Sequence, residues 1–174
     1  MLAAALAITA LSMWGCQSKP MEPITTSEYV DLERFMGDWY VIAHIPIFME
    51  KGAYQAVESY SLNQAGHIDT QFTFNEGGFD GERKSYNPKR FVVEDDTSNA
   101  VWKMQFLWPF KADYRIVYVD DQYQQTIVGR EARDYVWVMA RTPKLDDAEY
   151  DRLIQMVADE GYDLSGLRKV PQRG

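Results

Sequence analysis

The chain has 174 residues, enough for one domain with a sizeable core, and 46% of these residues are hydrophobic and 14% aromatic. A formal net charge of −8 argues against nucleic acid as a partner and against electrostatic adsorption to anionic lipid, because both require basic surfaces. The single cysteine, Cys16, excludes an internal disulfide and a cysteine metal cluster, and the two histidines leave little material for a zinc site, so no metal or other cofactor is expected.

The N-terminal segment is uncharged and apolar. Its alanine-rich run over residues 2–11 is too short to span a bilayer, but it has the length of the core of a signal peptide. Gly15 supplies the small residue expected before a cleavage point. We therefore predict a signal peptide over residues 1–15.

Cys16 follows this run directly, which resembles the acylation site of bacterial lipoproteins. The resemblance implies an acyl anchor, with palmitate as the expected chain, and a tether over residues 16–28. Gln17 stands where an aspartate would signal inner-membrane retention, which favours the outer membrane. The neighbouring Met13 and Trp14 depart from the lipoprotein pattern, and the alternative is a secretory signal with an incidental cysteine.

Eight segments after the tether have the composition of β-strands. In residues 67–74, the apolar side chains of Phe72 and Phe74 alternate with polar ones, as in a half-buried strand. Short turns separate the segments, which is typical of a closed antiparallel sheet. The predicted strands are 37–45, 56–62, 67–74, 84–94, 100–107, 113–119, 124–129 and 135–141.

The pattern changes to a helical period after Pro143. Asp146 is a plausible N-cap with Glu149 three residues later, and Gly161 is placed to end the helix. A helical turn is also expected within residues 29–35. The sequence thus predicts an all-β fold: an eight-stranded up-and-down antiparallel barrel over residues 29–174, with one C-terminal α-helix packed on the outside.

The strand faces assigned to the barrel interior carry large aromatic and thioether side chains. A barrel of this size is either filled by its own side chains or holds one small ligand, and the alternation alone does not separate these two cases. An aromatic lining with a few hydroxyl groups suits an acyl chain or another elongated apolar molecule. The candidate ligand-binding residues are Tyr60, Phe72, Phe74, Trp102, Met104, Phe106, Tyr114, Tyr118, Tyr135, Trp137 and Met139.

Three motifs occur in an order that resembles the lipocalin family. The first is a Gly-x-Trp signature at the first strand, the second an acidic–tyrosine turn between the sixth and seventh strands, and the third an arginine that ends the eighth strand. These motifs are Gly37–Asp38–Trp39, Asp120–Asp121–Gln122–Tyr123 and Arg141.

The resemblance implies scaffold roles for these residues. It places Trp39 as the plug of the closed end, with Arg141 across its indole, and Gly37 at the start of the first strand. Asp120 and Tyr123 are not adjacent as the family turn motif requires, so their role stays open.

Within the family, residues 60–62, 106–110 and 133–137 resemble the outer-membrane lipoprotein type, a group close to apolipoprotein D. That resemblance implies storage or transport of a fatty acid or lysophospholipid, a lipid-anchored location on the periplasmic face of the outer membrane, and a homodimer. It also turns Glu58 toward the interior, where the carboxylate either is solvated at the strand start or meets a ligand head group.

Two other functions compete with lipid carriage: transport of a tetrapyrrole or another hydrophobic pigment, and a structural envelope lipoprotein with a filled barrel. An axial ligand for haem would have to come from His44, His67 or a tyrosine, yet both histidines are expected at the surface. No Ser–His–Asp set is visible and the one thiol lies outside the barrel, so the chain is not expected to be an enzyme. The loop over residues 46–54, with Phe48 and Met49, is expected to be exposed at the mouth, where it could contact a membrane or a second subunit.

Overall fold

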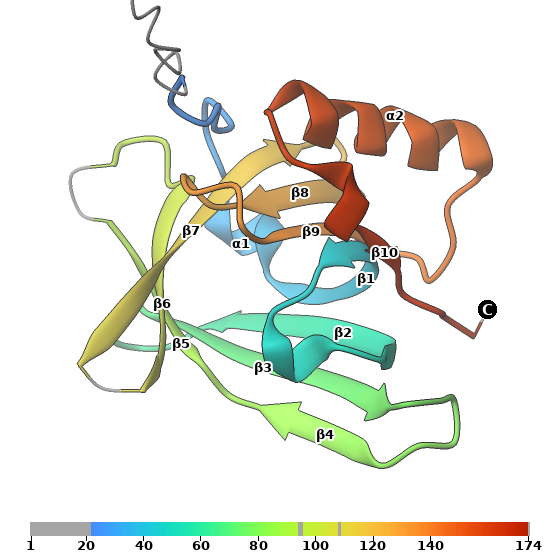
Figure 1. Ribbon diagram of the computed structural model, residues 1–174. Coiled ribbons are helices and arrows are strands. Elements are labelled where there is room, and N and C mark those ends of the chain that lie inside the picture. The colour runs from blue at the N-terminus through green and yellow to red at the C-terminus, as the bar shows by residue number, and fades with distance from the viewer. Residues whose placement is uncertain (1–21, 94–95, 108, 174) are drawn as a thin grey trace, which may run out of the picture.

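In the computed structural model (Figure 1), which describes residues 22–93, 96–107 and 109–173, the chain forms a closed antiparallel barrel. Each barrel strand pairs with its neighbour along the sheet, and the first strand closes the barrel by pairing with β9. The barrel strands are β1 (Gly37–Ile45), β2 (Ala53–Leu62), β3 (Ile68–Glu76), β4 (Arg83–Tyr86), β5 (Lys89–Val92), β6 (Val101–Leu107), β7 (Phe110–Val119), β8 (Gln125–Gly129) and β9 (Val136–Ala140).

The predicted strand over residues 84–94 is divided into β4 and β5. Both pair with β3, β4 opposite residues 72–75 and β5 opposite Ile68 and Asp69, so together they make the fourth strand of an eight-stranded barrel. The interruption falls at Asn87–Pro88, because proline has no amide hydrogen to donate to the ladder. The eight-stranded antiparallel barrel with a C-terminal helix is confirmed, and the single long strand is wrong in this one detail.

The C-terminal helix α2 (Asp147–Asp159) lies on the outside of the barrel, beside β8 and β9 in Figure 1. The Asp146 side chain accepts from the Glu149 amide at 2.8 Å and caps the helix, and Gly161 follows its end with a φ of +87°. Leu153 and Val157 are fully buried against outward-facing side chains of the barrel. Within the described residues, no helix is long and apolar enough to cross a membrane.

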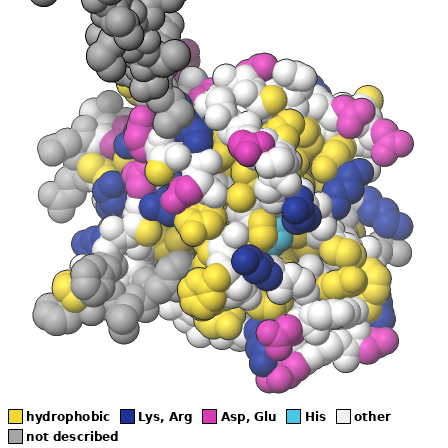
Figure 2. Space-filling view, viewed as in Figure 1, with side chains coloured by type: hydrophobic (Ala, Val, Ile, Leu, Met, Phe, Trp, Pro, Cys, Tyr) yellow, Lys and Arg dark blue, Asp and Glu magenta, His cyan; other side chains and the backbone are white. Residues whose placement is uncertain are grey.

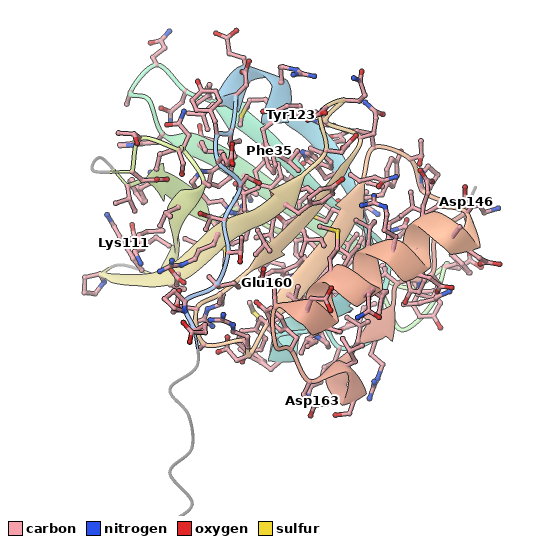
Figure 3. The ribbon with its side chains drawn as sticks, turned by 90° about the horizontal axis from the view of Figure 1, so that it is seen from above. Phe35, Lys111, Tyr123, Asp146, Glu160 and Asp163 are labelled. Atoms are coloured by element: carbon pink, nitrogen blue, oxygen red, sulfur yellow. The ribbon has the colours of Figure 1, made fainter. Side chains whose placement is uncertain are left out.

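The barrel has two unlike ends (Figure 3), with Phe35 and Tyr123 at one and Asp163 at the other. At the closed end, helix α1 (Leu32–Phe35) and the turn 120–124 cover the interior. The open end carries the loops 46–52, 77–82 and 130–135, the first of which contains the short helix η1 (Phe48–Glu50).

The C-terminal tail joins β1 to β2 near the open end. β1 pairs with β2 only as far as Tyr40, and beyond that point it pairs with β10 (Arg168–Lys169), which follows the short helix η2 (Leu164–Gly166). The Gln172 side chain then donates to the carbonyl oxygens of Val41 at 2.8 Å and Ala56 at 3.0 Å. The tail therefore supplies hydrogen bonds where the two strands have separated.

Candidate ligand-binding site

Trp39 lies fully buried at the closed end, where Arg141 covers it. The guanidinium carbon of Arg141 is 3.8 Å from the centre of the indole ring, and the indole N–H donates to the carbonyl of Phe35 at 2.8 Å. This is the position that the lipocalin resemblance implies for both residues. At Gly37 the backbone has a φ of +94°, which favours glycine, and a Cβ atom would lie in tight contact with Arg141, 3.3 Å from Nη1.

The acidic–tyrosine turn also belongs to the closed-end scaffold. One carboxylate oxygen of Asp120 accepts from the amides of Gln124 and Gln125 at 2.7 and 2.6 Å. Tyr123 adopts a left-handed backbone with a φ of +56°, and its hydroxyl accepts from the Asp31 amide at 2.8 Å. Asp120 thus holds the turn together, and Tyr123 fastens the N-terminal segment to the barrel.

Above the plug, aromatic rings fill the closed half of the barrel. The Phe35 ring lies 5.5 Å from Tyr60 and 5.3 Å from Trp102, and Trp102 stacks on Tyr114 at 5.8 Å. Such separations are typical of packed aromatic pairs. This part of the interior is a core rather than a cavity.

A buried ion pair crosses the middle of the barrel. One Glu58 oxygen accepts from Arg90 at 2.9 Å, from the Tyr114 hydroxyl at 3.1 Å and from the Tyr60 hydroxyl. Burial opposes the positive charge, but Glu58 holds the pKa of Arg90 above its ordinary value, and burial raises the pKa of Tyr114. Glu58 is 3% exposed, so the expectation of a solvated carboxylate is wrong; its counter-charge comes from Arg90, a partner that strand periodicity does not reveal.

Arg90 still has hydrogen-bonding capacity to spare. Its guanidinium lies 4.9 Å from the centre of the Tyr60 ring and 4.2 Å from that of Tyr114. Within the described structure its Nε and Nη1 atoms are buried without a partner, and so is the hydroxyl of Thr70. Buried donors of this kind are normally satisfied, which makes this the place where a polar group of a ligand or a water molecule would be held.

A second buried polar cluster lies in the open half of the interior. The Trp137 indole N–H donates to the two carboxylate oxygens of Glu50 at 3.3 and 3.1 Å, and His44 Nδ1 lies 3.3 Å from one of them. His44 is only 3% exposed, so its predicted surface position is wrong. A β-bulge between Val41 and Ala43 shifts the alternation and turns His44 inward beside Trp137. Sequence reasoning missed Glu50, which reaches this cluster from η1.

Most of the predicted lining residues do meet inside the barrel. Tyr135 is partly buried against the inner hydrophobic cluster, and eight further candidates belong to it. Phe106 lies on β6, in a stretch whose side chains are outside the described structure, as is Cys16 at the chain start. The eight are Tyr60, Phe72, Phe74, Trp102, Met104, Tyr114, Trp137 and Met139.

Tyr118 was also predicted to line the interior, but it lies on the outer face of the barrel. The pairing of β7 with β8 shifts between Ile116 and Tyr118, so a bulge reverses the faces beyond that point. Tyr118 consequently lies in the outer cluster beneath α2, where the guanidinium carbon of Arg152 is 5.4 Å from the centre of its ring. It is not a lining residue of the interior.

His67 takes part in neither of the two buried polar clusters of the interior. It is half-buried and its ring lies 4.7 Å from that of Phe91, edge to face. In the part of the chain that the structure describes, no group of three or more His, Cys, Asp or Glu residues is placed to hold a metal ion.

The lipocalin-like domain family matches residues 30–172, and the chain belongs to this family. Lipocalins generally bind hydrophobic ligands and are binding proteins rather than enzymes. As a member of the family, this chain is a binding protein and not an enzyme. The family match and the closed-end geometry agree, because the residues of the three motifs are those that fix Trp39 in place.

Curated relatives and solved structures support the assignment. The chain is 30% identical over 164 residues to temperature-induced lipocalin-1 of Arabidopsis thaliana, covering 90% of this chain and 85% of that protein. It is 28% identical over 180 residues to the outer membrane lipoprotein Blc of Escherichia coli K12, covering 98% and 96%, and 28% identical over 144 residues to bovine apolipoprotein D, covering 78% and 71%. The crystal structure of the cockroach allergen Per a 4 shares the fold, with a TM-score of 0.64, 19% identity, and coverage of 86% and 94%.

Proposed function

We propose that this protein binds a fatty acid or lysophospholipid in its barrel and stores or transports it in the cell envelope. The observation that carries the proposal is an apolar, aromatic barrel interior that holds the Arg90 guanidinium, whose Nε and Nη1 atoms have no partner among the described residues. Apolar walls suit an acyl chain, and a guanidinium suits the carboxylate or phosphate of its head group.

The open half of the interior is the place for the acyl chain. Its walls carry Phe72 and Phe74 from β3, Met104 from β6 and Trp137 from β9. Methionine adapts to irregular ligands because its side chain is unbranched and flexible. Ten buried methylenes would contribute about 8 kcal/mol before the costs of association, which is compatible with micromolar binding.

The envelope location is part of the same proposal. It is supported by relatives named as outer membrane lipoproteins and by the signal-like segment that precedes Cys16. Acylation of Cys16 would anchor the protein, since two or more chains give stable attachment. Cys16→Ser should move the protein from the membrane to the soluble fraction, with Ser18→Ala as the control; membrane retention of Cys16→Ser would show that the cysteine is not the anchor.

The decisive experiment is native mass spectrometry of the chain from Gln17 onward, followed by organic extraction of what co-purifies. We expect one fatty acid or lysophospholipid per barrel, and the same spectrum gives the number of subunits. Arg90→Met should reduce retention of an acid more than of the matching alcohol, because only the acid uses the guanidinium. An absorbing compound in the extract would instead indicate the pigment carrier.

A barrel filled by its own side chains is the second candidate function, that of a structural lipoprotein. It is favoured by the close ring contacts among Phe35, Tyr60, Trp102 and Tyr114. In that case the purified protein would be empty and would not bind an added fluorescent fatty acid. The carrier proposal would then be abandoned.

A further inference from the structure

A groove of about 580 Å³ lies at the open end of the barrel, between β1, β2 and the C-terminal tail. His44, Pro46 and Tyr54 contribute to its walls, and η1 lies beside it. Figure 2 shows that basic and hydrophobic side chains gather in the middle of this face. Its cations are Lys51, Arg168 and Lys169.

These three cations are exposed and have no carboxylate among the described residues within ion-pair distance. Arg168 donates instead to the carbonyl oxygens of Ser165 and Leu167, and the Lys169 ammonium lies 3.9 Å from the centre of the Tyr150 ring. On a chain of net charge −8, the groove is therefore a locally positive region. The overall charge predicts no attraction to anionic lipid, but the cations of this groove make such an attraction possible locally.

An exposed aromatic side chain stands next to the cations. Phe48 is 78% exposed, as the sequence predicts for this loop. The η1 turn that carries it is fixed by Glu50, whose carboxylate accepts from the Ile47 amide at 3.3 Å and from Trp137. Phe48 is thus presented outward on an anchored turn rather than on a loose loop, which suits insertion into an apolar layer.

The N-terminal residue of the described structure, Glu22, also lies at the open end. The carbonyl oxygen of Glu22 accepts from Arg133 at 2.8 Å, and Arg133 belongs to the open-end loop 130–135. Only five residues separate Cys16 from Glu22, a reach of roughly 20 Å. An anchor at Cys16, which is part of the proposed function, would hold the open end toward the bilayer.

We infer that the open end is a docking surface for an anionic lipid leaflet, with Phe48 inserted among the acyl chains and the groove cations on the phosphate groups. Docking in this orientation places the barrel mouth at the membrane, so an apolar ligand can pass between leaflet and interior without crossing water. The occupant of the groove is the head group of a membrane lipid.

The test uses the chain from Gln17 onward without an acyl group. Both hydrophobic clusters and all strand pairings of the described structure lie within residues 22–173, so this chain keeps them. Binding to phosphatidylcholine vesicles with and without phosphatidylglycerol would be measured by co-sedimentation. Lys51→Gln/Arg168→Gln should lower partitioning onto the anionic vesicles about 25-fold, since each cation near such a surface contributes about fivefold. Phe48→Ser should lower it about tenfold.

Matched variants at the other end serve as controls. Lys89→Gln/Lys144→Gln removes the same charge from two exposed lysines, and Tyr29→Ser removes an aromatic ring that is 61% exposed beside the closed end. Both should bind vesicles as the parent does. Equal losses in the controls, or unchanged binding in the open-end variants, would overturn the docking surface.

Displacement of the protein from vesicles by inorganic phosphate at constant ionic strength would also overturn the docking surface, by showing a site for a free anion. Because this chain lacks Cys16, the result is independent of the anchor, and ligand content is read separately by mass spectrometry.

Discussion

The two ends of the barrel are held by different kinds of interaction. At the closed end, Arg141 donates to the carbonyl oxygens of Arg34, Phe35 and Met36 at 2.8–3.1 Å and covers the Trp39 indole. At the open end, the side chains of His44, Glu50 and Trp137 meet one another. The Trp39 plug is thus fastened to backbone carbonyls, whereas the cluster around Trp137 is held by contacts among side chains.

This difference separates stability from ligand exchange. Backbone carbonyls cannot change charge or rotate away, so the closed end has one arrangement. A turn held through one carboxylate can be released without unfolding the sheet, and the apolar side chain of Phe48 is carried by just such a turn. Substitutions at the closed end should therefore cost stability, and those at the open end should mainly change binding.

The largest expected effect is that of Trp39→Ala. The variant should lose about 3–5 kcal/mol of unfolding free energy, as for other large truncations in cores, and the barrel should open rather than merely bind more weakly. Urea denaturation followed by tryptophan fluorescence would measure it. The matched variant is Trp137→Ala at the open half, which should lose no more than about half as much and should weaken ligand binding. Equal losses would mean that the barrel is filled at both ends.

The ion pair between the two halves should give the next largest effect. Arg90→Met leaves Glu58 buried without its counter-charge and should cost about 3 kcal/mol, measured by the same denaturation. Arg90→Met/Glu58→Leu removes both charges and should recover much of that loss. A double variant no more stable than the single one would show that the Glu58 interactions with Tyr60 and Tyr114 matter more than the charge pair.

Sequence reasoning located the closed end well because its motifs are local and ordered. Trp39 and Arg141 occur at strand ends that periodicity identifies, and the resemblance supplies their contact. The positions predicted for Tyr118 and His44 were wrong because a bulge reverses the alternation in each strand. One bulge places Tyr118 outside the interior, and the other turns His44 into it. A bulge depends on the pairing of a strand with its neighbour, and one strand read alone does not show it.

The polar contacts of the interior were hidden for a different reason. The resemblance turned Glu58 inward, but the sequence did not pair it with Arg90, because a charged residue in a strand is ordinarily assigned to the solvent face. Glu50 lies outside the strands, on η1, and only the fold brings it to His44 and Trp137. Pro88, by contrast, was a visible signal for the break between β4 and β5.

Arg141→Lys should have an intermediate effect that sharpens the contrast between the ends. A lysine keeps the charge but cannot donate from a planar fork to the carbonyl oxygens of Arg34, Met36 and Asp38. We expect a loss of about 2 kcal/mol, with ligand affinity unchanged, from denaturation and titration with a fluorescent fatty acid. A change in affinity without a loss of stability would contradict the assignment of Arg141 to the scaffold.

The smallest expected effect is the loss of stability when one carboxylate at either end, Asp96 or Asp113, is neutralised. Asp96, in the closed-end loop 93–100, accepts from the Val101 amide at 2.7 Å and from Ser98, whereas Asp113 accepts from Lys103 at 3.1 Å, from Arg115 at 2.9 Å and from the Glu131 amide at 3.0 Å. Burial opposes ionisation at both, but these hydrogen bonds and charges outweigh it and lower both pKa values below the ordinary value.

Because each pKa is lower in the folded state, each carboxylate stabilises the fold above its unfolded pKa, near 4, and loses that contribution as the pH falls through the folded pKa. Asp96→Asn and Asp113→Asn should therefore each lower stability by about 1 kcal/mol at neutral pH, with the difference from the parent vanishing in acid. Salt separates the two variants. The Asp113 effect should shrink at high ionic strength because two of its partners are partly exposed cations, while the Asp96 effect should persist because its partners are neutral. The measurement is thermal unfolding of both variants from acid to neutral pH at two salt concentrations. An equal response to salt would mean that charge pairs contribute no more to Asp113 at the open end than to Asp96 at the closed end.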